Sequence, residues 1–417
     1  FSRCTSLTSI TIPPSVTSIG SSAFAMCTSL ASVTLSSYVV TISRRTFARC
    51  TSLTSIIIPP SVTSIGHYAF SGCISLTSIT IPPSVTLIEY EALSGCTSLT
   101  SITIPPSVTS IEEGAFEGCT SLTSINIPPP VTSIDDYTFS GCTSLTSITI
   151  PPSVTSIGSS TFAMCTGLTL ITIPPSVTTI DSFAFSECTS LTSITLPSFI
   201  TSINDYTLSG CISLTSITLP PSLTGINFKA FCRCTSLTSI IIPPSVTIID
   251  GCAFDNCTSL TSINIPPSVT VIDDGAFEGC TSLTSIIIPP SVRMIGVGMF
   301  HMCINLRSVV WDSSVTPTSE YFNRCVNLKL LVTAHPVRDM EFTAECPNIR
   351  IVKKSSNTLI HAALSPYFSR YGLYNTKQRD FVVAWLLVWT RLLPDSHLYI
   401  PLELWLLVLT QLKLIEL

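Results

Sequence analysis

The sequence predicts an α/β solenoid, a right-handed coil of stacked repeats with a parallel β-sheet along one face, followed by a small helical C-terminal module. Cysteines recur every 23 residues from Cys4 to Cys303, and Cys325 and Cys346 follow at intervals of 22 and 21. A short apolar alternation that ends in Pro-Pro recurs in register with them. Self-similarity at a fixed period of roughly 20 to 50 residues is the signature of stacked-repeat proteins. Only 10% of the 417 residues are charged and 45% are hydrophobic, which is typical of a packed chain.

Residues 53–73 show how one coil is built. The stretch 53–58, LTSIII, directs alternate apolar side chains inward, which predicts a short strand. The two prolines that follow end the strand, because proline has no N–H to donate to a neighbouring strand. Val62 and Ile65 then return to the interior. Residues 68–72 are long enough for about one helical or 3₁₀ turn before the next cysteine.

Each coil has an apolar interior that it cannot bury alone, so the coils are expected to stack. Parallel strands lie about 4.8 Å apart, and equivalent residues of successive coils then form ladders. One ladder is aromatic, with Leu93 and Leu208 as substitutes. Its members are Phe24, Phe47, Phe70, Phe116, Phe139, Phe162, Phe185, Phe231, Phe254, Phe277 and Phe300.

The ladder cysteines are interpreted as small buried core residues. Disulfides between stacked coils satisfy the Cα distance but require a regular ladder to be disturbed. Zinc typically needs converging C-x-x-C pairs, and the sequence has only the C-x-C of Cys232 and Cys234. So many unpaired thiols favour a reducing compartment, and we therefore expect a cytoplasmic protein, with the cell surface as the alternative.

The repeat resembles the BspA-like class of leucine-rich repeats, whose pattern is C-x-x-L-x-x-I-x-I-P-x-x-V-x-x-I-x-x-x-A-F. The resemblance covers residues 1–310 in regular 23-residue copies, and residues 311–352 are interpreted as degenerate capping repeats. It implies a curved leucine-rich repeat solenoid with the parallel sheet on the concave face. It also implies binding or adhesion rather than catalysis.

Two surfaces are candidates for partner binding. On the concave face the candidate residues are Thr80, Thr103, Asn126, Thr149, Thr172, Thr195, Thr218 and Asn264. On the variable stretch before each Phe the sequence predicts an acidic ridge, formed by Glu89, Glu91, Glu112, Glu113, Asp135, Asp136, Asp273 and Asp274. If the concave face does not bind a partner, it is either a solvated hydroxyl surface or an array of hydroxyls that orders water. The second either keeps a charge-poor solenoid soluble or contacts a basic partner.

No catalytic constellation, metal site or cofactor motif is evident, so we expect neither an enzyme nor a cofactor. The five histidines are scattered, and the paired carboxylates repeat along a surface rather than converging. Between residues 51 and 290 there are fifteen acidic residues and only two basic ones, Lys229 and Arg233. Without a basic stripe, nucleic-acid binding is not expected.

Residues 353–357 are predicted to be a linker and residues 358–417 a helical module. The segment from residue 400 resembles the start of an F-box, L-P-x-E-(L/I)-x-x-x-I-L-x-x-L. Pro401, Glu403, Leu404 and Leu409 fit this pattern, and Trp405 shares the apolar face of the expected helix. The resemblance implies docking to a Skp-type adaptor of a cullin ubiquitin ligase. The alternatives are a helical cap on the solenoid and a membrane anchor, which the charged and proline residues disfavour.

The sequence therefore favours a non-enzymatic scaffold for an unknown protein partner. The alternatives are an adhesin-type surface protein and an F-box-type substrate receptor. The chain begins without methionine and inside a repeat, so we expect a fragment of a longer protein.

Overall fold

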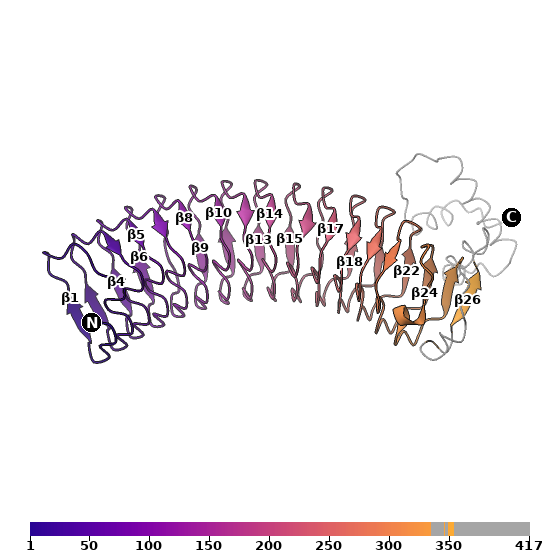
Figure 1. Cartoon of the computed structure of the whole chain (residues 1–417), viewed down its shortest axis with the longest axis horizontal. Coiled ribbons are helices and arrows are strands. Elements are labelled where there is room, and N and C mark those ends of the chain that lie inside the picture. The colour runs from indigo at the N-terminus through magenta and orange to yellow at the C-terminus, as the bar shows by residue number, and fades with distance from the viewer. Residues whose placement is uncertain (335–345, 347–348, 354–417) are drawn as a thin grey trace, which may run out of the picture. The chain divides into compact units, whose positions relative to one another are not determined.

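The computed structural model describes residues 1–334, 346 and 349–353. The chain divides into two compact units, Phe1–Val352 and Lys353–Leu417. The first is a parallel β-solenoid whose coils stack in chain order (Figure 1). The predicted linker, helical module and F-box-like segment all lie outside the described residues, apart from Lys353. Within the described residues the one helix is the 3₁₀ turn η1, Ser319–Phe322.

The predicted strand is present in most repeats and pairs in parallel with the strand one repeat away, within several short sheets. Ser55 pairs with Ser78 and Ile57 with Thr80, so one coil contributes one rung. Isolated bridges join the two coils in which the strand is interrupted, at Thr103 and Thr218. The strands of this first sheet series are β1 Ser9–Thr11, β2 Ser32–Thr34, β4 Ser55–Ile57, β6 Ser78–Thr80, β9 Ser124–Asn126, β11 Ser147–Thr149, β13 Leu170–Thr172, β15 Ser193–Thr195, β18 Ser239–Ile241, β20 Ser262–Asn264, β22 Ser285–Ile288, β24 Ser308–Trp311, β25 Leu330–Thr333 and β26 Arg350–Lys353.

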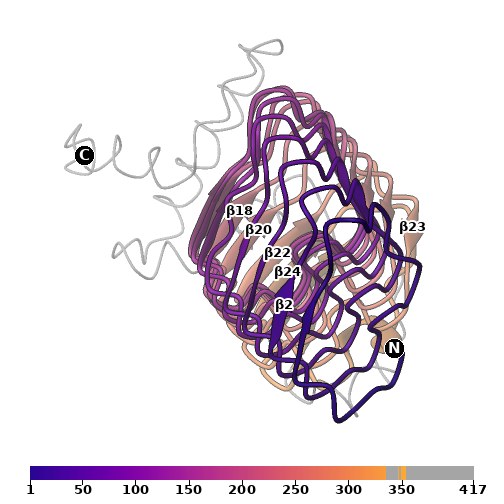
Figure 2. The same ribbon diagram turned by 90° about the vertical axis from the view of Figure 1, so that its left-hand side faces the viewer.

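A second series of short parallel strands, which the sequence did not indicate, lies across the coil from the first. Seen along the stack, β18, β20 and β22 lie on one side and β23 on the other (Figure 2). Two residues per coil are too few to show an alternating pattern. The members are β3 Thr41–Ile42, β5 Ser64–Ile65, β7 Leu87–Ile88, β8 Ser110–Ile111, β10 Ser133–Ile134, β12 Ser156–Ile157, β14 Thr179–Ile180, β16 Ser202–Ile203, β17 Gly225–Ile226, β19 Ile248–Ile249, β21 Val271–Ile272 and β23 Met294–Ile295.

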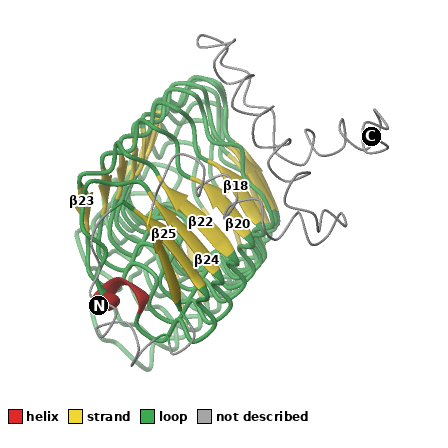
Figure 3. Cartoon of the chain, turned by 90° about the vertical axis from the view of Figure 1, so that its right-hand side faces the viewer, coloured by secondary structure: helices red, strands yellow, loops and turns green. Residues whose placement is uncertain are grey.

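The segment expected to form a helical turn forms tight turns instead (green in Figure 3). In residues 66–73 the N–H of Ala69 donates to Gly66 O at 3.0 Å, and that of Cys73 donates to Phe70 O at 3.0 Å. The third residue of each turn is left-handed, Tyr68 at φ 56° and Gly72 at φ 72°. A helix cannot include such residues, and the alternation frees every second N–H to bond the next coil. We call residues 66–73 and their equivalents the turn edge.

The interior confirms the predicted aromatic ladder. Phe139 lies between Phe116 and Phe162, with ring centroids 5.7 and 5.6 Å apart and interplanar angles of 5° and 10°. Leu93 and Leu208 are fully buried at the corresponding positions. Near the C-terminal end of the described coils Phe322 continues the stack on Phe300 at 5.7 Å. The hydrophobic core is therefore one continuous column, and each layer of it contacts only the layers next to it.

Many surface hydroxyls join one coil to the next. Ser61 Oγ donates to Val39 O at 2.6 Å, and Ser84, Ser107, Ser153 and Ser176 repeat this bond one coil at a time. Threonines in three other rows donate to carbonyls of the preceding coil, among them Thr109, Thr120 and Thr123. Much of the hydroxyl content that suggested a solvated surface thus satisfies backbone carbonyls between coils.

Candidate functional site: strand face and turn edge

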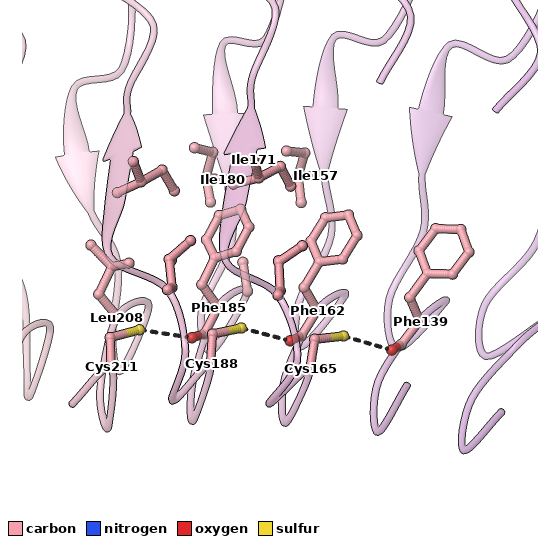
Figure 4. Close-up of a cluster of buried hydrophobic side chains, with 14 of the residues drawn as sticks. Phe139, Ile157, Phe162, Cys165, Ile171, Ile180, Phe185, Cys188, Leu208 and Cys211 are labelled. Atoms are coloured by element: carbon pink, nitrogen blue, oxygen red, sulfur yellow. Dashed lines mark hydrogen bonds between the residues drawn. The ribbon is translucent and has the colours of Figure 1, made fainter. Parts of the chain in front are cut away.

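The cysteine ladder is structural. All 18 cysteines are free thiols, so the disulfide alternative does not hold. From Cys27 to Cys303, each ladder thiol donates to the carbonyl of the residue 26 positions earlier, as in Cys165 Sγ to Phe139 O at 3.2 Å and Cys188 Sγ to Phe162 O at 3.1 Å (Figure 4). Cysteine is a small side chain with a weak S–H donor, and it reaches that carbonyl beside the column of stacked rings (Figure 4).

The buried thiols are expected to react slowly. Burial raises the pKa of Cys50 and of Cys165 to about 12, and the thiolate is the reactive species. Cys4 is exposed and Cys252 is half-buried, while the other cysteines are buried. Titration with Ellman's reagent should therefore detect few thiols in the native protein and all 18 after denaturation. Detection of far fewer than that number in denaturant without reductant would contradict the free-thiol ladder.

The strand face consists of the outward-pointing residues of the first sheet series. It includes the eight predicted concave-face residues, Thr80, Thr103, Asn126, Thr149, Thr172, Thr195, Thr218 and Asn264, and all eight are exposed. Their side chains make no hydrogen bond to any other described residue. They differ in this from the hydroxyls of the inter-coil rows, which are occupied. The strand face is thus the part of the hydroxyl surface that remains available to a ligand.

Apolar side chains interrupt the strand face at a few coils. Ile57 is 81% exposed and Ile241 is 84% exposed, at positions where most coils have threonine. Leu170, which lies two residues before Thr172 on the same strand, is 57% exposed. Ile287 is 51% exposed. These residues are well separated along the stack. Each is a single apolar contact point on an otherwise polar surface.

The predicted acidic ridge forms on the turn edge, but several of its carboxylates are already occupied. Glu89 Oε2 accepts the backbone N–H of His67 at 3.1 Å, and Glu112 Oε2 accepts that of Tyr90 at 2.9 Å. Asp136 Oδ1 likewise accepts Ser159 N–H at 2.7 Å. Asp274 does the same for Val297. Part of the ridge therefore accepts hydrogen bonds from backbone N–H groups of neighbouring coils. This structural role is additional to the two that the sequence predicted, solubility and the binding of a basic partner.

Other members of the ridge are electrostatically unfavourable. Burial raises the pKa of Glu113, and the nearby Asp136 and Glu91 carboxylates raise it further. Burial also raises the pKa of Glu117, which lies on the turn edge but is not one of the eight ridge residues, and the Glu91 and Glu113 carboxylates add to the effect. Like charges stacked one coil apart repel, and desolvation disfavours the ionised form.

This crowding predicts a pH-dependent stability. The folded state binds more protons than the unfolded state, because folding raises these pKa values above the ordinary 4.5. The preferential protonation of Glu113 and Glu117 in the folded state therefore stabilises the fold below about pH 4.5. This contribution to the free energy of unfolding is lost as the pH rises through the pKa values of the folded state. Replacing Glu113 and Glu117 with glutamine should therefore raise the unfolding midpoint at pH 7.5 and leave it nearly unchanged at pH 4. An equal gain at both pH values would contradict this explanation.

A hollow of about 600 Å³ beside the ridge is lined by side chains of both charges. It is lined by Arg44, His67, Tyr90, Glu112 and Asp135, among others. His67 Nε2 lies 3.3 Å from Glu89 Oε2. No group of three or more His, Cys, Asp or Glu side chains in the described part of the chain is arranged to hold a metal ion. Nor does any helix of the described residues have the length and apolar character that crossing a bilayer requires.

Comparison with known proteins agrees with the coil geometry. The chain is similar to a leucine-rich repeat protein from Bacteroides ovatus, at 33% identity over 85% of this chain and 86% of that chain, with a TM-score of 0.71. It is also similar to a leucine rich cell surface protein from Faecalibacterium prausnitzii, at 28% identity over 84% and 89% of the two chains, with a TM-score of 0.51. A search of curated proteins finds no match.

The family comparison covers the same coils and does not extend to the C-terminal segment with Pro401 and Glu403. The family model of the BspA type leucine rich repeat region, which spans six copies of the repeat, matches over residues 1–123, 86–214 and 201–329. These ranges include the strand series, the cysteine ladder and the turn edge described above. The chain belongs to the family of BspA-type leucine-rich repeat proteins.

Proposed function

We propose that the chain is a non-enzymatic scaffold that binds a protein partner through the strand face. The observation that carries this proposal is the array of exposed polar side chains that have no hydrogen-bond partner among the described residues, including Thr149 and Thr172. A rigid column of coils holds these side chains at a spacing of about 4.8 Å along the stack. Binding residues presented on a rigid element lose little conformational entropy when a partner binds.

The exposed isoleucines give this surface its apolar contact points. Ile57 and Ile241 have no function in the core, since both side chains are more than four-fifths exposed. Protein interfaces typically combine a few apolar anchors with surrounding polar contacts. The strand face offers that combination without any charged residue in the regular strands from β1 to β22.

The test is to capture the partner with the full chain and with two matched double variants. Ile57→Thr with Ile241→Thr places the commoner residue on the strand face. Ile74→Thr with Ile212→Thr does the same at the residue that follows the turn edge, where these side chains are 46% and 43% exposed. We expect the first variant to bind the captured partner about tenfold or more weakly, a loss of about 1.4 kcal/mol, and the second to bind normally. Equal binding by both variants would exclude the strand face.

An adhesin-type role at the cell surface is the second candidate. It is supported by the similarity to the Faecalibacterium prausnitzii protein, which is described as a cell surface protein. The free thiols favour the cytoplasm instead, and that placement stays a prediction. Labelling intact source cells with a membrane-impermeant amine reagent separates the two, because only a surface protein becomes labelled.

The substrate-receptor alternative depends on residues outside the described ones. It is tested by comparing capture by the full chain with capture by a chain that ends at Asn357. A Skp-type adaptor bound only by the full chain would support it. Absence of the adaptor from both would leave the strand-face partner as the relevant one.

A further inference from the structure

The first two complete coils differ in charge from the rest of the turn edge. Residues 1–50 contain four arginines, Arg3, Arg44, Arg45 and Arg49, and no aspartate or glutamate. The next 240 residues contain fifteen acidic and two basic residues. The coils of residues 1–50 are therefore basic whereas those of residues 51–290 are acidic, and nothing in the coil architecture requires this difference.

Three of these arginines line one hollow, which we call the arginine trough. It has a volume of about 470 Å³ and is lined by Arg3, Arg45, Arg49 and Tyr68, among others. Ala25 and Ala48 also line it and are buried, so small side chains form its base. Its size falls within the range of small-molecule pockets, about 300–1,000 Å³.

No described carboxylate neutralises the arginine side chains of the trough. Arg3, Arg45 and Arg49 form no ion pair with any carboxylate among the described residues. The Arg45 guanidinium carbon lies 4.9 Å from the centroid of the Tyr68 ring. This cation–π contact orients the group without neutralising it. Glu91 is the one carboxylate among the residues that line the trough, and it lies two coils away from Arg45 and Arg49.

The backbone positions of these arginines are ones that glycine favours. Arg45 has φ 55° and Arg49 has φ 57°. In the following four coils the position of Arg49 is occupied by Gly72, Gly95, Gly118 and Gly141, all with positive φ. A left-handed conformation costs a non-glycine residue about 1–2 kcal/mol. Other coils also have residues other than glycine at these two positions, among them Met26, Met164 and Glu187, so the backbone conformation by itself does not distinguish the trough.

We propose that the arginine trough binds the oxyanion group of a phosphorylated or sulfated small molecule. Arg45 and Arg49 of one coil flank the base of the trough and can both donate to a single tetrahedral anion, which guanidinium groups bind in bidentate geometry. Tyr68 supplies an aromatic surface for the organic part of the ligand. Arg3, two coils from Arg49, adds charge at the other end of the trough.

A second copy of the chain is the competing occupant, through its acidic ridge. The structure favours the small anion for two reasons. The ridge carboxylates of Glu89, Glu112 and Asp136 already accept backbone N–H groups. The trough is recessed, and its base of buried alanines is accessible to a small ion more readily than to a raised edge.

The test uses calorimetric titration of the full chain with inorganic phosphate, inorganic sulfate, glucose 6-phosphate and glucose 6-sulfate at low ionic strength. The trough variant is Arg45→Gln with Arg49→Gln. The matched control is Lys229→Gln with Arg233→Gln. Lys229 and Arg233 occupy the same two repeat positions in another coil, and their replacement removes the same amount of charge. Thermal unfolding establishes that both variants are folded.

We expect saturable binding that weakens at least tenfold in the trough variant and less than twofold in the control. Whichever ester binds more tightly identifies phosphate or sulfate as the natural group, and either result supports the proposal. Equal weakening in both variants, or no saturable binding by any probe, would overturn it. Concentration-dependent dimerisation that the trough variant abolishes, without anion binding, would assign the trough to a second copy instead.

Discussion

Replacing Phe139 with alanine is expected to cost about 3–5 kcal/mol of local stability. Phe139 is fully buried between two stacked rings, and its carbonyl accepts the Cys165 thiol. Removing the ring leaves a cavity that the rigid layers on either side cannot close. Because each coil contacts only its neighbours, the damage should remain within a few coils.

Hydrogen exchange measured coil by coil checks this expectation. Amides near residues 116–165 should lose protection, and those beyond residue 254 should keep it. Simultaneous loss of protection in every coil would contradict nearest-neighbour coupling. A pair of double variants provides the control. The losses of unfolding free energy caused by alanine at Phe139 and at Phe162 should not add, because the two rings touch. The losses caused by alanine at Phe139 and at Phe277, which are far apart, should add.

Replacing Gly158 with alanine is expected to cost about 1–3 kcal/mol, although its φ is not one that demands glycine. An added Cβ would lie 2.7 Å from the backbone nitrogen of Asp136 and would also overlap its Oδ1. That carboxylate accepts the Ser159 N–H at 2.7 Å, so the substitution would displace one of the caps between coils.

Gly20 is the matched control, since it occupies the same repeat position and an added Cβ there meets nothing within 4 Å. Its replacement by alanine should change the free energy of unfolding by less than about 0.5 kcal/mol. Urea unfolding followed by circular dichroism compares the two variants. A Gly158→Ala protein as stable as the Gly20→Ala protein would show that the Asp136 cap contributes nothing.

The function of the carboxylates on the turn edge illustrates what a repeat pattern leaves open. Asp136 and Glu112 were predicted to be surface charges of one ridge, and both do lie on it. Their side chains nevertheless bond backbone groups in opposite directions along the stack, Asp136 to the following coil and Glu112 to the preceding one. That direction depends on turn geometry, and residues with positive φ such as Tyr137 have no distinctive sequence signal.

The sequence by itself determined the period, the stacking direction and the interior of this protein. In a chain of near-identical repeats the neighbour of a buried residue is the same residue one period away, so Phe packs on Phe and Cys lies above Cys without further information. What the tertiary structure alone decided is which polar groups are occupied. Stacking brings hydroxyls, carboxylates and thiols to carbonyls and N–H groups 22 to 26 residues distant, as for Ser61, Glu112 and Cys165. It leaves the eight strand-face residues without a hydrogen-bond partner, and the trough arginines without a carboxylate partner, among the described residues. A periodic pattern specifies which residues are neighbours, but hydrogen-bond partners depend on distances and angles that exist only after the coils have closed.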